Sequence, residues 1–187
     1  MNTRRFLGLG WCGAAILLAG CAGYRLGPTS GNDARSRSVQ VNFFRNEAPE
    51  PRLSEAVAHA LRKQLQQEGT YTLATHNDGD IVVNGVLLAY ERSPVAYQPG
   101  DVTTVRDYEI TLRAHVVAEE RSTGRVVLDE KVRGRATVRI GARNPLPDGQ
   151  MPPVLAGDQA SVERQTLPIL AADLARNITA RLVDGAW

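Results

Sequence analysis

Two consecutive segments with alternating apolar and polar residues constrain the fold of this chain more than any other feature. Apolar residues recur at every second position in residues 104–120, and the same pattern returns in residues 126–140. A period of two is typical of a β-strand with one buried and one exposed face. Residues 121–124 form a short turn between the segments. The pattern therefore predicts a long antiparallel hairpin.

Three further segments are predicted strands. Residues 39–44 alternate, which puts Phe43 on the same side as the two valines before it. Residues 71–74 predict a short extended strand. Residues 80–92 carry apolar side chains in both parities, as expected of a strand covered on both faces.

Two segments have the spacing of amphipathic helices. In residues 53–69 the apolar side chains recur every three or four positions and the segment ends on a glycine, a common helix terminator. A second stripe occupies residues 167–182, with Asp158 or Ser161 as the candidate N-cap. Pro168 either kinks this second helix or lies in its first turns.

Residues 93–103 and 141–157 are rich in proline and glycine and are predicted loops. The chain then reads strand, helix, short strand, three long strands and helix. Both apolar helix stripes and the inward strand faces are buried most simply when the helices lie on one side of the sheet. We therefore predict an α+β two-layer sandwich: a mainly antiparallel or mixed sheet of four to five strands, with two helices packed on one face.

The N-terminus has the organisation of a secretory signal peptide. Arg4 and Arg5 precede an apolar run, and small residues precede Cys21. The apolar run is shorter than the roughly 20 apolar residues that a membrane-spanning helix needs. The tetrapeptide LAGC at residues 18–21 resembles the bacterial lipobox, in which the signal peptidase cuts before a cysteine that carries a diacylglycerol.

The lipobox divides the chain into three parts. We expect residues 1–20 to be a signal peptide of the lipoprotein type and Cys21 to be the lipidation site. Residues 21–38, rich in Gly, Ser and Arg, would then be a lipidated flexible tether, and residues 39–187 a single domain. The residue after the cysteine is alanine, not aspartate, which by resemblance to sorting rules favours the outer membrane. Because buried acyl chains bind a bilayer firmly, we expect a lipid-anchored protein on the periplasmic side of the cell outer membrane.

Charge and motifs exclude several classes of function. Loss of the signal peptide removes Arg4 and Arg5, so the 22 basic side chains fall to 20 and equal the 20 acidic ones. A neutral domain is a poor nucleic-acid binder, because neutralisation of phosphates supplies most non-specific affinity. Cys12 would leave with the signal peptide and Cys21 would be lipidated, so no free thiol would remain for a disulfide or a metal. With no metal-ligand spacing, phosphate loop or nucleophile motif, we expect no enzyme activity, no metal and no cofactor.

One basic ridge stands out. Lysine and arginine occupy alternate positions of the last predicted strand and continue into the loop after it, at Lys131, Arg133, Arg135, Arg139 and Arg143. Because the guanidinium fork binds phosphate and carboxylate in a bidentate manner, such a row suits an anionic lipid head group. The simpler interpretation is cross-strand pairing with acidic residues of the preceding strand, and both can hold at once.

Several short motifs occur in the order of a known family. They are a CAGYRLG sequence after the lipobox, Phe44, Asn46, Pro51 and Leu53 before the first helix, Tyr90, Pro94 and Tyr97 after the third strand, and the turn at Thr123 and Gly124. Together they resemble the LptE family, the lipopolysaccharide-assembly lipoproteins of the Gram-negative outer membrane. The resemblance covers nearly all of the chain after the lipobox.

The resemblance implies a non-enzymatic role. A member of this family binds an LptD-type β-barrel, sits as a plug in its lumen, helps it assemble and engages lipopolysaccharide on its way to the outer leaflet. The alternative, which the residues leave open, is a periplasm-facing lipoprotein that binds a hydrophobic or anionic ligand without a barrel partner. That alternative predicts a ligand-sized pocket between helices and sheet.

Overall fold

The computed structural model of the chain describes residues 37–98, 100–140, 146–150 and 156–184. The expected signal peptide, Cys21, nearly all of the expected tether and Arg143 lie outside these residues. The predictions for them therefore stay predictions.

A mixed sheet forms one layer of the described domain. Strands β4 (Ile81–Gln98), β5 (Asp101–Glu120) and β6 (Val126–Arg139) form an antiparallel meander. On the other side of β4 lie three short strands, β1 (Ser38–Val41), β2 (Arg45–Asn46) and β3 (Thr72–Leu73). The strand order is β3-β1-β4-β5-β6, with β2 also paired to β4, and all pairs that involve β1 or β2 are parallel.

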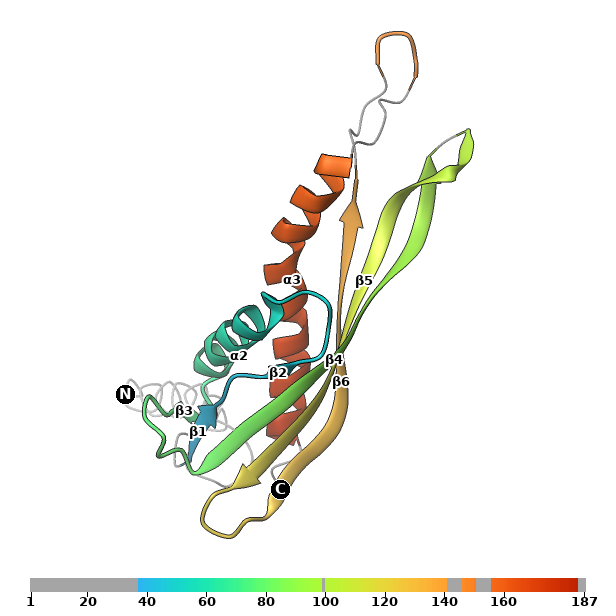
Figure 1. Cartoon of the computed structure of the whole chain (residues 1–187). Coiled ribbons are helices and arrows are strands. Elements are labelled where there is room, and N and C mark those ends of the chain that lie inside the picture. Colours follow the sequence, from blue (N-terminus) through green and yellow to red (C-terminus); the bar gives the residue numbers. More distant parts are fainter. Residues whose placement is uncertain (1–36, 99, 141–145, 151–155, 185–187) are drawn as a thin grey trace, which may run out of the picture. The chain divides into compact units, whose positions relative to one another are not determined.

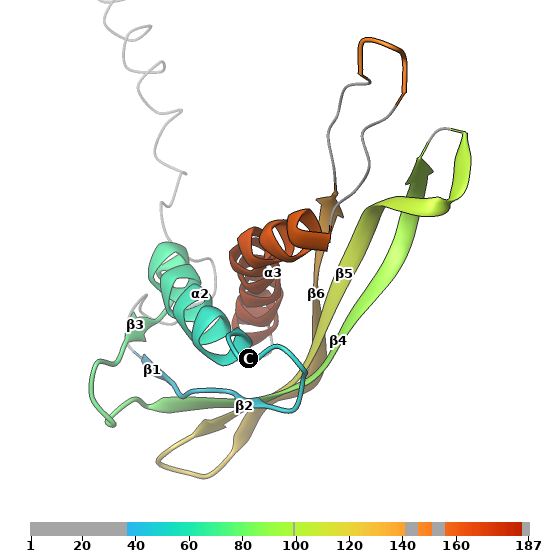
Figure 2. The same cartoon turned by 45° about the horizontal axis from the view of Figure 1, so that its top comes forward.

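Two helices form the second layer. Helix α2 (Leu53–Glu68) and helix α3 (Ala156–Asp184) lie on the same side of the sheet (Figures 1 and 2). In the described part of the chain, neither helix combines the length and apolarity needed to cross a membrane. The predicted α+β architecture, with a mixed sheet and both helices on one face, is confirmed; within the described residues the sheet has six strands, not four to five, because the two-residue strand β2 also pairs with β4.

The core lies between the two layers. Alternate residues of β5 and β6 point toward the helices and are almost fully buried, as are the apolar stripes of α2 and α3. The largest fully buried side chains are Leu53, Leu61, Leu65, Ile81, Leu87, Ile110, Leu112, Ile140, Leu170, Leu174, Ile178 and Leu182. Helix α3 comes very close to β6 at Gly134. A Cβ atom at this position would lie only 2.7 Å from the backbone nitrogen of Leu174.

The prediction of a loop at residues 93–103 is wrong. Strands β4 and β5 continue through this segment and turn at Gly100, whose φ of 81° suits glycine. Pro94 pairs with Tyr108 inside the hairpin. A proline is tolerated at this position because β4 is an edge strand beyond its short pairing with β2, so no neighbouring strand needs its missing N–H.

Two smaller expectations also fail. The first strand ends at Val41, so the alternation does not continue: Phe43 is 69% exposed and Phe44 is buried. Helix α3 begins at Ala156, which places both candidate N-caps, Asp158 and Ser161, inside the helix. Pro168 lies in the helix interior, which excludes the second of its two alternatives, a place in the first turns.

Candidate functional site

The outer face of the sheet, which the helices leave uncovered, carries the basic ridge. Lys131, Arg133, Arg135 and Arg139 are alternate residues of β6, and all four are exposed. From Val132 to Ile140 every second residue is buried, so the strand pleat sorts apolar and basic side chains onto opposite faces. The sequence prediction that these four residues share one outward face is therefore confirmed.

The far end of the ridge is neutralised by acids. Arg139 lies opposite Asp107 and binds it in a bidentate manner, with Nε donating to Oδ1 at 2.7 Å and Nη2 donating to Oδ2 at 3.0 Å. The hydrogen bond from Arg139 holds the pKa of Asp107 below its ordinary value. Arg135 lies 4.0 Å from Glu109. The simpler interpretation, cross-strand ion pairing, is thus correct for Arg139 and Arg135.

The near end of the ridge is different. Within the described residues, neither Lys131 nor Arg133 forms an ion pair with an acidic side chain. Arg133 lies directly opposite Arg113 of β5, and Arg113 also contacts Glu91 of β4. Like charges directly across a strand pair are destabilising, so this arrangement is not explained by fold stability.

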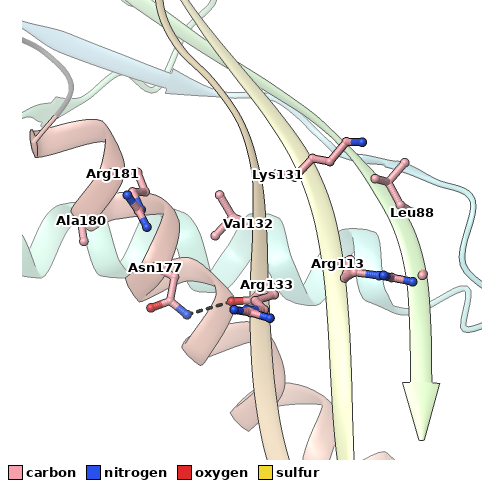
Figure 3. Close-up of a pocket in the computed structure, with 9 residues that line it drawn as sticks. Leu88, Arg113, Lys131, Val132, Arg133, Asn177, Ala180 and Arg181 are labelled. Atoms are coloured by element: carbon pink, nitrogen blue, oxygen red, sulfur yellow. Dashed lines mark hydrogen bonds between the residues drawn. The ribbon is translucent and has the colours of Figure 1, made fainter.

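These cations line a groove at the edge of the sheet. The groove has a volume of about 880 Å³ and runs from the outer face around β6 to the C-terminal part of α3 (Figure 3). Arg113, Lys131 and Arg133 contribute from the sheet, and Asn177 and Arg181 contribute from the helix. The apolar lining residues are Leu88, Ala89, Val132 and Ala180. We call this feature the basic groove.

Helix α3 is fixed to the edge of β6 by two side chains. Asn177 Nδ2 donates a 2.9 Å hydrogen bond to the carbonyl oxygen of Arg133, and Asp173 Oδ2 accepts one of 2.9 Å from the backbone N–H of Arg135. These bonds satisfy backbone groups that an edge strand otherwise leaves unpaired. They also hold Arg181, one helical turn after Asn177, beside the sheet cations.

The sequence did not single out Arg113 or Arg181 as site residues. The predicted hairpin places Arg113 on the same outward face as the ridge. The hairpin pattern does not predict that Arg113 pairs with Arg133, because the register between the strands is not visible in the sequence. Arg181 comes from an element far away in the sequence, and only the docking of α3 on β6 brings it to the groove.

The groove suits an anion that also has an apolar part. Guanidinium and ammonium groups bind phosphate oxygens through charge-assisted hydrogen bonds, and Leu88 is a large aliphatic side chain exposed beside them. Across the described ranges, no cluster of His, Cys, Asp and Glu side chains is arranged to hold a metal ion. The groove presents cations and an aliphatic surface to a ligand.

The comparison with protein families decides the assignment. Residues 36–182 match the family model described as LptE, lipopolysaccharide-assembly. The chain belongs to the LptE family. The match covers all but the last two described residues, so the uncovered sheet face and the basic groove lie within the matched LptE region. This family is one of non-enzymatic lipoproteins that act in lipopolysaccharide assembly at the outer membrane.

Several solved structures are similar to this chain, and the first of the three named here supports the fold. A hypothetical protein from Chlamydia trachomatis superposes with a TM-score of 0.52 at 12% identity, over 80% of this chain and 96% of that one. A minor lipoprotein from Acinetobacter baumannii has a TM-score of 0.49 at 15% identity, over 79% and 91%. Rare lipoprotein B from Shewanella oneidensis has a TM-score of 0.47 at 12% identity, over 78% and 94%. A search of curated proteins found no match.

Proposed function

We propose that this LptE-family protein is a lipid-anchored subunit of a lipopolysaccharide-assembly complex. In this proposal Cys21 carries the acyl chains, the domain faces the periplasm, and the domain binds an LptD-type β-barrel and sits as a plug in its lumen. Family membership supports the partner. The uncovered sheet face also supports it, because ion-paired side chains such as Arg139 and Asp107 suit the polar interior of a large barrel.

The basic groove is the observation that carries the second half of the proposal, direct contact with lipopolysaccharide. Lys131 and Arg133 have no acidic partner among the described residues, and Arg113 is held opposite Arg133 at a cost in stability. A phosphate bound between them would remove that repulsion. Leu88 would contact the apolar part of the same molecule. Arg143 extends the ridge in sequence and stays a candidate contact.

The barrel partnership is tested by affinity purification of the tagged lipoprotein from solubilised outer membranes. We expect a large β-barrel to be recovered in a near one-to-one ratio. Recovery of the lipoprotein alone, under conditions in which other outer-membrane complexes stay intact, contradicts the partnership. Mass spectrometry of the purified chain tests the anchor, since a free Cys21 or an uncleaved N-terminus is incompatible with it.

The lipopolysaccharide contact is tested by charge reversal. We expect the Lys131→Glu and Arg133→Glu variants to bind purified lipopolysaccharide about tenfold or more weakly than the wild type, since each loses a charge-assisted contact. Arg45→Glu is a suitable control, because Arg45 is an exposed arginine of β2 outside the groove. Equal loss of binding in the control would show a general charge effect and not a site.

The alternative, a ligand pocket between helices and sheet, has less support. The space between the layers is filled by large side chains with almost no exposure, such as Leu112 and Leu174. The basic groove opens at the sheet edge instead. A barrel-free lipoprotein with an internal ligand is therefore not our proposal.

A further inference from the structure

A second groove lies at the opposite edge of the sheet, beside β1 and β3. It shares no lining residue with the basic groove. It has a volume of about 350 Å³ and is formed by the segment that follows β1, by α2 and by the loop after β3. These three elements lie together at one end of the domain (Figure 2). The polar side chains in its lining are Gln40, Asn42, Arg62, Thr75, His76 and Asn77. We call this feature the amide groove.

An exposed aromatic ring lies in the amide groove and is held in place. Phe43 is 69% exposed, although Phe44 beside it is buried in the core. The guanidinium of Arg62 lies over the Phe43 ring, 5.3 Å from its centroid. Arg62 is itself fixed, because its Nη2 donates a 2.6 Å hydrogen bond to the carbonyl oxygen of Val41. A large exposed ring is therefore presented in one orientation, which lowers the entropy cost of stacking a ligand on it.

A chain of amides orients the polar side of the groove. Gln40 is only 8% exposed, and its Nε2 donates to Asn42 Oδ1 at 2.7 Å and to Asn77 Oδ1 at 3.2 Å. Its Oε1 accepts a 2.6 Å hydrogen bond from Arg121 Nη2. The Asn77 oxygen accepts the hydrogen bond from Gln40, which fixes the end of the amide that faces Gln40. The other end, the Asn77 nitrogen, is a hydrogen-bond donor. A buried polar network of this kind is rigid when its members are satisfied.

The loop that carries Asn77 packs closely against Gln40. A Cβ atom at Gly79 would lie 2.6 Å from the Cβ of Gln40, so the loop can close on Gln40 only with glycine at this position. Arg121 Nε also donates to the carbonyl oxygen of Gly79 at 2.9 Å. The loop that carries Asn77 is thus anchored to the same arginine that holds Gln40.

The lining selects one class of ligand. No carboxylate is among the lining residues that the structure describes, so the groove has no negative charge to favour a cation. Among the same lining residues Arg62 is the one permanently charged side chain, which is weak attraction for a polyanion. A pyranose ring has an apolar C–H face that stacks on an aromatic ring, and hydroxyls that exchange hydrogen bonds with amide, imidazole and guanidinium groups.

We propose that the amide groove binds an uncharged saccharide, with one sugar ring stacked on Phe43 and its hydroxyls bonded to Asn77 and Arg62. Two sources of such a sugar exist at an outer membrane: the glycan part of lipopolysaccharide and the glycan strands of the cell wall. The proposal does not depend on a barrel partner or on the basic groove.

Calorimetric titration of the full-length lipoprotein tests the proposal, in a detergent without a sugar head group. The probes are dephosphorylated core oligosaccharide released from lipopolysaccharide, and a trimer of N-acetylglucosamine. We expect at least one probe to bind, and the one that binds identifies the source. Phe43→Ala should weaken that binding about tenfold, whereas Phe43→Tyr should retain it.

The control variant is Ile169→Ala, which removes another exposed apolar side chain outside the groove. It should bind the probe as the wild type does. Side-chain amide signals in NMR spectra supply a second readout, because Asn77 should shift on addition of the probe. Absence of binding by both probes, or binding that Phe43→Ala leaves unchanged, overturns the proposal. Loss of barrel recovery in Phe43→Ala without any saccharide binding would assign Phe43 to a protein contact instead.

Discussion

Two arginines of the same ridge should respond to the same substitution with opposite signs. Arg133→Gln removes a charge that lies directly opposite Arg113 and has no acidic partner among the described residues. Arg139→Gln removes a charge that makes two hydrogen bonds to Asp107. Both are exposed residues of β6, and glutamine keeps much of the aliphatic stem in each. We therefore expect the first variant to be more stable than the wild type and the second to be less stable.

The size of the effect at Arg133 follows from its register. Directly opposite residues have Cβ atoms about 5 Å apart, and long side chains spread their charges to about 8 Å. Two unit charges at about 8 Å repel by about 0.5 kcal/mol in water, which is an upper bound here because the Glu91 carboxylate beside Arg113 offsets part of the repulsion. Such a gain raises the midpoint of thermal unfolding by about 1–2 °C in a domain of this size. The gain should disappear at about 1 M salt, where the Debye length falls to about 3 Å.

Chemical denaturation at low and high salt measures both variants. The comparison also separates stability from function, because Arg133→Gln should lose lipopolysaccharide binding while it gains stability. A ridge that is purely structural would behave differently. If Arg133→Gln destabilises the domain as much as Arg139→Gln does, the assignment of Arg133 to ligand binding is wrong.

Three further predictions concern the fold. Gly134→Ala should lower the free energy of unfolding by about 1–3 kcal/mol, because the new methyl group overlaps the backbone of Leu174. Denaturant titration measures this loss, and a smaller loss contradicts the close approach of α3 to β6. Thr179→Val should raise the free energy of unfolding by about 1 kcal/mol, because the buried Thr179 hydroxyl has no hydrogen-bond partner among the residues that the structure describes; a destabilised variant would contradict this. The folded-state pKa of Asp107 is lowered by Arg139, so the stability it contributes is present above its unfolded value of about 4 and is lost as pH falls through the lower folded value. Asp107→Asn should therefore be less stable than the wild type at pH 7, and the deficit should shrink as pH falls through the folded-state pKa; a deficit that stays constant into acid would argue against the ion pair.

Much of this architecture is readable from the sequence because β5 and β6 alternate without interruption. Their pleat alone places Lys131 and Arg133 on the face opposite the core. The register between the strands is harder, since Arg113 meets Arg133 only through the geometry of the turn. The position of Arg181 depends on how α3 docks, which no local pattern encodes.

The errors in the sequence prediction have specific causes. Pro94 and Gly100 are common in loops, yet an edge strand tolerates the first and a tight hairpin turn uses the second. The reversal at Phe43 and Phe44 arises because β1 stops at Val41, and two adjacent phenylalanines give no local signal of which one is buried. Phe43 is thus exposed in the amide groove and not buried in the core as the sequence pattern predicted.

We expect the near end of the ridge to contact lipopolysaccharide and the far end to pair only within the sheet. Site-specific photo-crosslinking in living cells tests this most directly, because a photoactivatable residue can replace Leu88, which lines the basic groove, or Thr137, an exposed residue at the far end, and leave every ridge cation in place. We predict a lipopolysaccharide adduct from position 88 and little or none from position 137. Adducts of equal yield from both positions, or from neither, would contradict the account.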